Sequence, residues 1–179
     1  MKIIAFTGMP FSGKSVAVEV AKERGLPVVR MGDMVWGEVK RRGLPLTDET
    51  VGRIATAMRK TYGKDIWAQQ TLKKIQAMDR TKTLIIDGIR NHEEIEAFKQ
   101  ALGEEFVVIA ITAPDAIRYQ RALTRGREDD SSTLEQIKER DEREKGWGIE
   151  AVIASADIVV PNEGSKEEFI TRIRQILKK

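Results

Sequence analysis

The residues with the clearest chemical meaning form one short loop near the start of the chain. Eight consecutive residues match the pattern G-x-x-x-x-G-K-[ST] at every fixed position. Glycines at both ends of such a loop let backbone N–H groups wrap around a polyphosphate, which a Cβ atom would obstruct. The lysine reaches the β- and γ-phosphates, and the final hydroxyl ligates Mg²⁺. The motif predicts binding of a nucleoside triphosphate with Mg²⁺ by Gly8, Met9, Pro10, Phe11, Ser12, Gly13, Lys14 and Ser15.

The segments that flank this loop are those that its chemistry requires. Lys2–Thr7 is an apolar run with the length of one buried strand. After the loop, Val16, Val20 and Ala21 recur at helical spacing, and Gly25 ends the pattern. The helix would point the positive end of its dipole at the bound anion. A chance glycine turn would not require this strand–loop–helix context.

A carboxylate at the end of a second apolar run is the expected partner of the metal. Thr83–Asp87 predicts a buried strand, and open α/β sheets place ligand-contacting groups at the carboxyl ends of their strands. We predict that Asp87 is catalytic and holds Mg²⁺ through water; the alternative is a turn residue before Gly88. The glutamate that follows this aspartate in many ATPases is absent, and no Asn-Lys-x-Asp motif for guanine occurs. These differences favour phosphoryl transfer to an acceptor over hydrolysis.

Two charged residues near strand ends are candidates for contact with the acceptor. Arg90 lies three residues after Asp87, where a guanidinium can grip a phosphate with two hydrogen bonds. The alternative for Arg90 is a surface ion pair with Glu93 or Glu94. Asp33 follows another short apolar strand, so it is either an acceptor contact or a helix N-cap.

A group of arginines in the second half of the chain is suited to neutralise the negative charge on a phosphoryl group during its transfer. Arg118, Arg121 and Arg125 recur at i, i+3 and i+7, which places them on one stripe of a predicted helix. Phosphoryl transfer needs such cations around the transferring group. The alternative is a solvated face, and the catalytic hypothesis concerns mainly Arg121 and Arg125. Arg140 and Arg143 lie on the next predicted helix, where they are candidates to complete the same group of cations.

The rest of the chain predicts an α/β fold. Short apolar strands alternate with helices along all 179 residues, which predicts a mostly parallel sheet with helices on both faces. Met31–Asp33 is expected as a turn after the second strand, with a helix only beyond it. Two capping boxes, Asn91 with Glu94 and Ser132 with Glu135, predict the starts of later helices.

Composition excludes several other kinds of protein. Without cysteine, no disulfide framework, thiolate zinc site or thiol catalysis is possible. The net charge of +3 is interspersed along the chain and does not form a nucleic-acid footprint. No apolar run approaches the roughly 20 residues that a membrane span needs, and the first residues lack the features of a signal peptide. We therefore expect a cytoplasmic protein whose partner is a small-molecule nucleotide.

Several motifs taken together resemble one enzyme family. Met31-Gly-Asp-Met34 and Asp87-Gly-Ile-Arg90 resemble the acceptor-site motifs of adenylate kinase, and Arg121-x-x-x-Arg125 resembles its lid arginines. Residues 156–165 resemble the final strand and base-contacting loop of dephospho-CoA kinase. The chain is thus similar, over nearly its full length, to the small P-loop kinases, and most of all to an archaeal family related to these two enzymes.

The resemblance implies a P-loop NTPase three-layer α/β/α sandwich with a five-stranded parallel sheet in the order 2-3-1-4-5. It implies a single domain over residues 1–179, with a helical acceptor-binding insert over about 34–65 and a short lid over about 121–132. It also implies MgATP as the donor, with Asn162 and Gly164 beside the adenine. The chain departs from the family pattern in a lid without zinc-binding cysteines and in lacking the Asp-Ala-Asp of dephospho-CoA kinase.

We therefore predict an ATP-dependent kinase of the nucleoside-monophosphate type, with ATP and Mg²⁺ as cofactors. Two alternatives stay open: transfer to a hydroxyl, as in dephospho-CoA kinase, and an ATP-binding switch or assembly ATPase that regulates a partner. The expected catalytic residues are Lys14, Asp87, Arg121 and Arg125, the expected metal ligands are Ser15 and Asp87, and the expected acceptor contacts are Asp33 and Arg90.

Overall fold

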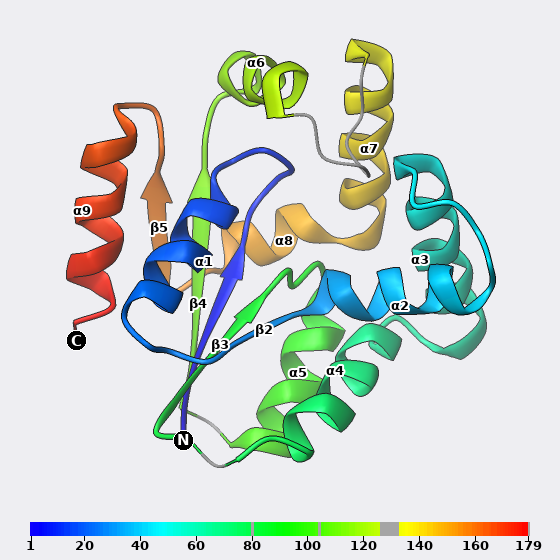
Figure 1. Ribbon diagram of the computed structural model, residues 1–179, viewed down its shortest axis with the longest axis horizontal. Coiled ribbons are helices and arrows are strands. Elements are labelled where there is room, and N and C mark those ends of the chain that lie inside the picture. The colour runs from blue at the N-terminus through cyan, green and yellow to red at the C-terminus, as the bar shows by residue number, and fades with distance from the viewer. Residues whose placement is uncertain (80, 104, 126–132, 179) are drawn as a thin grey trace.

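A five-stranded parallel sheet forms the centre of the computed structural model, which describes residues 1–79, 81–103, 105–125 and 133–178. The strand order is β2-β3-β1-β4-β5, and all neighbouring strands are parallel. The strands are β1 (Lys2–Thr7), β2 (Val28–Arg30), β3 (Thr83–Asp87), β4 (Phe106–Thr112) and β5 (Ile158–Pro161). Helices lie on both sides of this sheet (Figure 1). The predicted three-layer sandwich and the predicted strand order are both confirmed.

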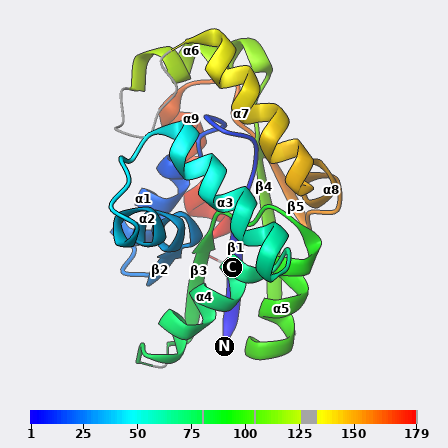
Figure 2. The same ribbon diagram turned by 90° about the vertical axis from the view of Figure 1, so that its right-hand side faces the viewer.

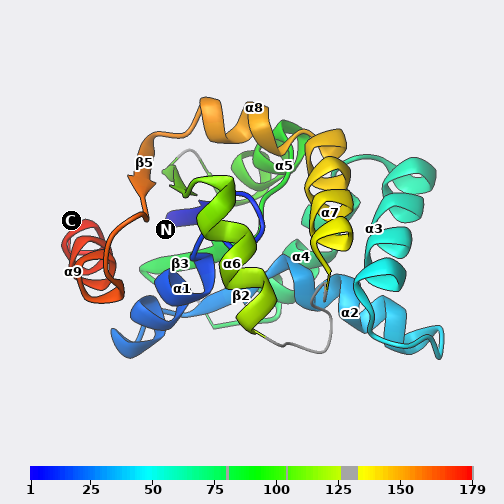
Figure 3. The ribbon, with the colours of Figure 1, turned by 90° about the horizontal axis from the view of Figure 1, so that it is seen from above.

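Helices connect the strands and cover both faces of the sheet. They are α1 (Lys14–Glu23), α2 (Met31–Arg41), α3 (Asp48–Tyr62), α4 (Ile66–Gln76), α5 (His92–Leu102), α6 (Asp115–Arg125), α7 (Leu134–Trp147), α8 (Ile149–Ala154) and α9 (Lys166–Ile176). Helices α1 and α9 pack on one face, and α4, α5 and α8 pack on the other (Figure 3). Across the described residues, no helix combines the length and the apolar character needed to cross a membrane.

The central strand β1 is buried on both faces, as its continuous apolar sequence predicts. Ile3 and Ala5 belong to the core beneath α4 and α5, whereas Ile4 and Phe6 belong to the core beneath α1 and α9. All four side chains are at most 6% exposed. Each large side chain buried in this way contributes about 1.5–3 kcal/mol to stability. This burial fixes the register of the strand that leads into the P-loop.

Parallel pairing brings the two predicted phosphate-binding segments to the same edge of the sheet. Phe6 in β1 is in register with Asp87 in β3, and the backbone N–H of Gly88 donates to the carbonyl oxygen of Phe6 at 3.1 Å. The P-loop and the segment after β3 therefore leave the sheet side by side, at its carboxyl edge.

The segment after β2 differs from the prediction. Helix α2 begins at Met31, so Met31–Asp33 forms its first turn and not a separate turn. Arg30 occupies the N-cap position, so the prediction of Asp33 as an N-cap is wrong, although its carboxylate still lies in the first turn, where it favours the helix dipole. The span 34–65, predicted as the acceptor insert, contains the rest of α2 and all of α3, which extend to one side of the sheet (Figures 1 and 2).

The two predicted capping boxes are only partly right. Asn91 does cap α5, accepting a hydrogen bond from the backbone N–H of Glu94 at 2.8 Å. The Glu94 carboxylate, however, accepts from the backbone N–H of Arg90 at 2.7 Å instead of closing the box. Helix α7 is capped by Thr133, which forms the capping box with the residue three positions on, and Ser132 lies outside the described residues. The predicted lid covers residues 121–132. Residues 121–125 form the end of α6, and residues 126–131, like Ser132, lie outside the described residues.

One buried arginine joins α6 and α7 to the P-loop. Arg118 is 1% exposed, and its guanidinium donates to the Asp141 carboxylate at 2.5 and 3.0 Å and to Asp115 at 2.7 Å. It also donates to the carbonyl oxygen of Pro10 at 2.9 Å. The first member of the predicted arginine stripe is therefore a structural residue, neither solvated nor directed at a ligand.

Replacing Arg118 should destabilise the protein strongly. In Arg118→Met the Asp141 carboxylate, 2% exposed, would lose its cationic partner while remaining buried. We expect the free energy of unfolding, measured by urea denaturation, to fall by about 3–5 kcal/mol. The double change Arg118→Met with Asp141→Leu should recover most of that loss, because both charges are removed together. A single variant as stable as the wild type would contradict this role.

Candidate active site

The P-loop has the backbone geometry that a phosphate-binding loop requires. Gly8 has φ +143°, and a Cβ at this position would lie 2.2 Å from the carbonyl oxygen of Ile111. Gly13 has φ +114° and directly precedes α1. Phe11, with φ 63°, is the one non-glycine residue of the described chain with a positive φ. A loop of this shape at a helix start is an anion site, because backbone N–H groups and the helix dipole both favour negative charge.

Lys14 is the first residue of α1, and the loop itself holds its ammonium group. Nζ donates to the carbonyl oxygens of Gly8 at 2.5 Å and Met9 at 3.1 Å. Burial lowers the pKa of Lys14 from 10.5 to about 7, and the nearby charge of Arg90 acts in the same direction. A phosphate beside Nζ would raise this pKa again, because an opposite charge favours the protonated amine.

Asp87 presents one carboxylate oxygen that no protein group uses. Its Oδ2 lies 3.6 Å from Nε of Arg30, whereas Oδ1 is buried and has no hydrogen-bond partner in the described part of the chain. Mg²⁺ bound with a nucleotide takes its oxygen ligands from phosphates, water and one or two protein groups. Ser15 and Asp87 fit that requirement. Among the described residues, no cluster of three or more histidine, cysteine or acidic side chains is placed to hold a metal ion.

A cavity of about 530 Å³ connects the P-loop with α2, α3 and α7. Of the residues that the structure describes, nine lysine or arginine side chains and four carboxylates line it, although the whole chain has 31 basic and 28 acidic residues. The basic lining residues are Lys14, Lys22, Arg30, Arg59, Arg90, Arg121, Arg140, Arg143 and Lys166. The acidic ones are Glu19, Asp48, Asp87 and Glu144. Among the described lining residues, positive charge thus predominates, which makes the cavity suited to anions.

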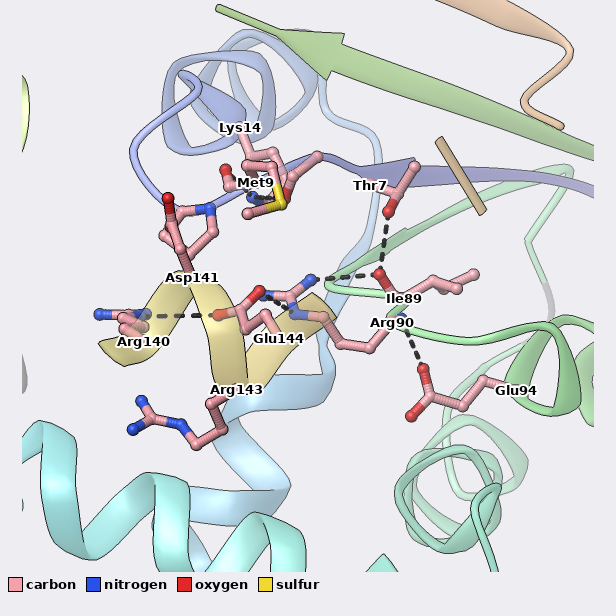
Figure 4. Close-up of polar contacts among 12 residues, drawn as sticks. Thr7, Met9, Lys14, Ile89, Arg90, Glu94, Arg140, Asp141, Arg143 and Glu144 are labelled. Carbon is pink, nitrogen blue, oxygen red and sulfur yellow. Dashed lines mark hydrogen bonds and ion pairs between the residues drawn. The ribbon is translucent and has the colours of Figure 1, made fainter. Parts of the chain in front are cut away.

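Arg90 extends from the loop after β3 toward α7 (Figure 4). Its Nε lies 2.7 Å from Oε2 of Glu144, and its Nη1 donates to the carbonyl oxygen of Ile89 at 3.2 Å. Glu144 is 3% exposed, and its Oε1 lies 3.5 Å from Nε of Arg140. Burial alone would raise the pKa of Glu144, but the charges of Arg90 and Arg140 outweigh burial and hold the pKa below its ordinary value. Glu144 is therefore an ionised carboxylate between two arginines.

Helix α7 is also tied to α3 across the cavity. Asp48, the first residue of α3, accepts two hydrogen bonds from Nη2 of Arg143, at 2.9 and 3.0 Å, and lies 3.5 Å from Nη1 of Arg140. Gly52 leaves room for this contact, because a Cβ there would lie 2.3 Å from Cζ of Arg143. The two helices lie side by side in both views (Figures 1 and 3), so the ion pairs close one wall of the cavity.

Arg121 and Asn162 approach the P-loop from the other side. Arg121 donates to the carbonyl oxygens of Ser12 at 3.2 Å and Asn162 at 2.9 Å. The Asn162 amide also donates to the Ser12 carbonyl, at 2.8 Å. Burial lowers the pKa of Arg121. These contacts bring together three of the predicted site residues, Ser12, Arg121 and Asn162. Arg121 and Asn162 also line the cavity.

Other predicted site residues are not brought into this group. The Asp33 side chain is 39% exposed and lies 3.7 Å from Arg30, and neither Asp33 nor Gly164 is among the described residues that line the cavity. The side chain of Arg125 lies outside the described part of the structure. The roles predicted for these three residues stay predictions.

The alternative predicted for Arg90, a surface ion pair with Glu93 or Glu94, is wrong. Its guanidinium pairs with Glu144. Glu93 pairs with Lys64 at 2.9 Å. Glu94, which is buried, pairs with Arg59 at 2.8 Å.

Sequence reasoning missed the carboxylates Asp48 and Glu144, which hold the arginines of α7. Glu144 lies in a densely charged helix of the kind usually read as solvated. One signal was present: Ile137, Asp141 and Glu144 are spaced i, i+4 and i+7, and all three are buried on one face of α7. A search for apolar periodicity does not recognise such a face, because two of its three members carry charge.

Comparisons with known proteins agree with this fold. A family model described as an AAA domain matches residues 7–138. The chain is 49% identical over 180 residues to a UPF0200/UPF0201 protein of Archaeoglobus fulgidus, covering 100% of this chain but only 56% of that protein. It is 42% identical over 177 residues to a UPF0200 protein of Methanosarcina barkeri, covering 99% of this chain and 95% of that protein.

Two solved structures share the fold. Shikimate kinase from Aquifex aeolicus aligns with a TM-score of 0.54 at 20% identity, covering 98% of this chain and 96% of that one. Shikimate kinase from Acinetobacter baumannii, in complex with shikimate, aligns with a TM-score of 0.60 at 14% identity, covering 99% of this chain and 93% of that one. At these identities the likeness concerns the fold alone.

Binding of MgATP at alkaline pH should be accompanied by proton uptake. With a pKa of about 7, Lys14 is about nine-tenths neutral at pH 8, and a phosphate beside it favours the charged form. Using a non-hydrolysable ATP analogue with Mg²⁺, we expect uptake approaching about one proton per nucleotide at pH 8 and much less at pH 6, where Lys14 is already charged. Calorimetry in buffers of different ionisation enthalpy measures the uptake. Lys14→Met should abolish it, and equal uptake by that variant would assign the proton to another group.

Proposed function

Because the chain belongs to the UPF0200 family, with an AAA domain over residues 7–138, we propose that it is an ATP-dependent kinase acting on a nucleoside monophosphate. The P-loop kinase fold supports nucleotide-dependent phosphoryl transfer. The choice of acceptor rests on the chemistry of the cavity.

The excess of positive charge in the cavity is the observation that carries this proposal. A neutral acceptor would require cations only around the donor phosphates, next to the P-loop. Arg90, Arg140 and Arg143 instead gather beyond Lys14, on the wall that α7 forms with α3. A monophosphate brings about 1.5–2 negative charges at pH 7, together with three strong acceptor oxygens. Arginine is well suited to bind such a group because its planar fork matches phosphate geometry.

Each part of the site has a role in this proposal. Lys14 and the P-loop N–H groups hold the donor phosphates, and Ser15 and Asp87 hold Mg²⁺. The metal, when bound, neutralises charge that develops on the phosphates. Arg90 binds the acceptor phosphate, on the opposite side of the cavity from the adenine end near Asn162.

Neutralisation of the transferring group falls to Arg121 and Arg125. Arg121 already lies against the P-loop through the Ser12 carbonyl, so its charge is close to the donor phosphates. Arg125 follows one turn later on α6, which ends at that residue. Cations at this position act mainly in the transition state, when charge spreads over the transferring oxygens.

A hydroxyl acceptor is the second candidate, and Asp87 is the residue that favours it. Its buried Oδ1, without a partner in the described chain, is able to accept a proton from an attacking hydroxyl. The same oxygen suits the metal, so this observation does not separate the two acceptor classes by itself. Asp33, which follows β2, is a second candidate to accept that proton, and it lies farther out, beside Arg30.

A panel of acceptors incubated with MgATP tests the proposal directly. We expect a nucleoside monophosphate to be converted to the diphosphate, with chromatography separating the products. Lys14→Ala should lower the rate by at least about 10²-fold while the fold survives, because the lost stabilisation is electrostatic and local. ATP loss without any phosphorylated acceptor would instead support an ATPase that acts as a switch.

The change Asp33→Asn tests whether Asp33 is the general base that a hydroxyl acceptor would need. A phosphate oxygen is already ionised near pH 7, so its attack needs no general base. We therefore expect kcat to stay within about tenfold of the wild type, about 1.4 kcal/mol, with the main effect on the acceptor KM. Loss of a general base would lower kcat by about 10²–10⁴-fold. Such a fall at an unchanged acceptor KM would rule out the monophosphate acceptor in favour of the hydroxyl.

A further inference from the structure

A buried carboxylate lies among the cations that would bind the acceptor. Glu144 projects from α7 into the cavity lining and is 3% exposed. Figure 4 shows Arg90 approaching it from one side and Arg140 from the other, with Lys14 nearby. The two guanidinium Nε atoms lie 2.7 and 3.5 Å from its two oxygens. This carboxylate thus already occupies part of the site that the cations define.

Without a ligand, this carboxylate has a clear electrostatic function. Crowded guanidinium groups repel one another, and a buried charge is tolerated only when opposite charges surround it. Glu144 pairs with Arg90 and Arg140, and it is also close enough to oppose the lowering of the Lys14 pKa. It therefore serves as the counter-ion that lets these basic side chains share one cavity.

The same arrangement conflicts with binding of an anion. A phosphate gripped by Arg90 would come close to the Glu144 carboxylate, since the Nε of Arg90 lies 2.7 Å from that group. Two like charges close together in a poorly solvated cavity repel each other strongly. An anionic ligand must therefore draw Arg90 and Arg140 away from Glu144 in order to bind.

We propose that Glu144 is a specificity-determining residue of the acceptor site, where it acts as a resident counter-ion that an incoming phosphate displaces from Arg90 and Arg140. This inference rests on the proposed function, because it concerns the acceptor side of that same cavity. Exchange of partners, and not simple occupation of a preformed site, then governs acceptor binding.

The exchange selects one class of acceptor. A ligand carboxylate offers the arginines the same single charge and two oxygens that Glu144 already provides. A phosphate monoester offers nearly twice the charge and a third acceptor oxygen. A neutral hydroxyl compound offers no charge at all. Glu144 therefore favours dianionic phosphate monoesters over carboxylates and over uncharged acceptors.

A competing explanation predicts the opposite effect of one substitution on phosphate affinity. If Glu144 merely holds Arg90 in the orientation that binds phosphate, removing its charge should weaken binding of the anion. If Glu144 competes with the ligand, removing its charge should strengthen binding. Glu144→Gln serves this comparison because it keeps the size and shape of the side chain and a carbonyl oxygen next to Arg90, while the negative charge is lost.

The experiment titrates inorganic phosphate into the protein and follows tryptophan fluorescence, since Trp147 lies one turn from Glu144 and lines the same cavity. Saturating Mg²⁺ complex of a non-hydrolysable ATP analogue fills the donor site, so that phosphate reports on the acceptor side. We expect Glu144→Gln to bind phosphate at least about tenfold more tightly than the wild type. Glu139→Gln, on an exposed position of the same helix, makes the same charge change and should leave the affinity within about twofold.

Unchanged or weaker phosphate binding by Glu144→Gln would overturn the proposal. Should that variant fail to fold, Glu144→Asp keeps the charge but withdraws it from Arg90, and it should tighten phosphate binding by a smaller factor. Weaker binding by Glu144→Asp would likewise overturn the proposal. Saturation by the ATP analogue is measured separately beforehand, so a failure of the donor site, which would undermine the proposed function, is distinguishable from a failure of the exchange.

Discussion

The crowding of positive charge around one cavity is the constraint on which the rest of this structure depends. Arginines from the loop after β3 and from helices α3, α6 and α7 converge there, and such a group would repel itself without buried counter-ions. Each of three carboxylates meets one part of that need: Glu144 for Arg90, Asp48 for Arg143 and Glu94 for Arg59. Outside the cavity lining, Asp141 pairs in the same way with Arg118. The helices are held where they are largely because these pairs, and not only apolar contacts, join them.

Local signals in the sequence were enough to predict the P-loop and the carboxylate at the end of β3. The P-loop is contiguous, and its glycines are required by backbone geometry that a short motif encodes directly, as Gly8 against Ile111 shows. Asp87 was predictable for a similar reason, since an apolar run of strand length places its last residue at the carboxyl edge of a parallel sheet. The strand order followed from the family resemblance, because periodicity alone does not specify which strands are neighbours.

The contacts that hold the arginines of the cavity could not be predicted, because the partners are far apart in the chain. Asp48 and Arg143 are separated by 95 positions, and Arg121 and Ser12 by 109, so no local pattern links them. Helical spacing placed the members of the arginine stripe on one face, but it does not say whether that face meets water, a carboxylate or a ligand. The start of α2 was missed for a different reason: it follows β2 without a connecting turn, and Arg30 caps it without any side-chain signal.

The type of partner that each arginine has determines what it is able to do. Arg118 is bound by two carboxylates and a carbonyl, so its charge is cancelled and it serves to join helices. Arg121 donates to two carbonyl oxygens, and within the described chain it has no carboxylate partner. Carbonyl groups orient a guanidinium without neutralising it, so Arg121 keeps its full charge beside the P-loop. Arg90 is intermediate, with one carbonyl and one carboxylate, which makes its charge available only when Glu144 releases it. One residue type thus supplies a structural tie beside the P-loop, and both a fixed positive charge and an exchangeable one within the cavity.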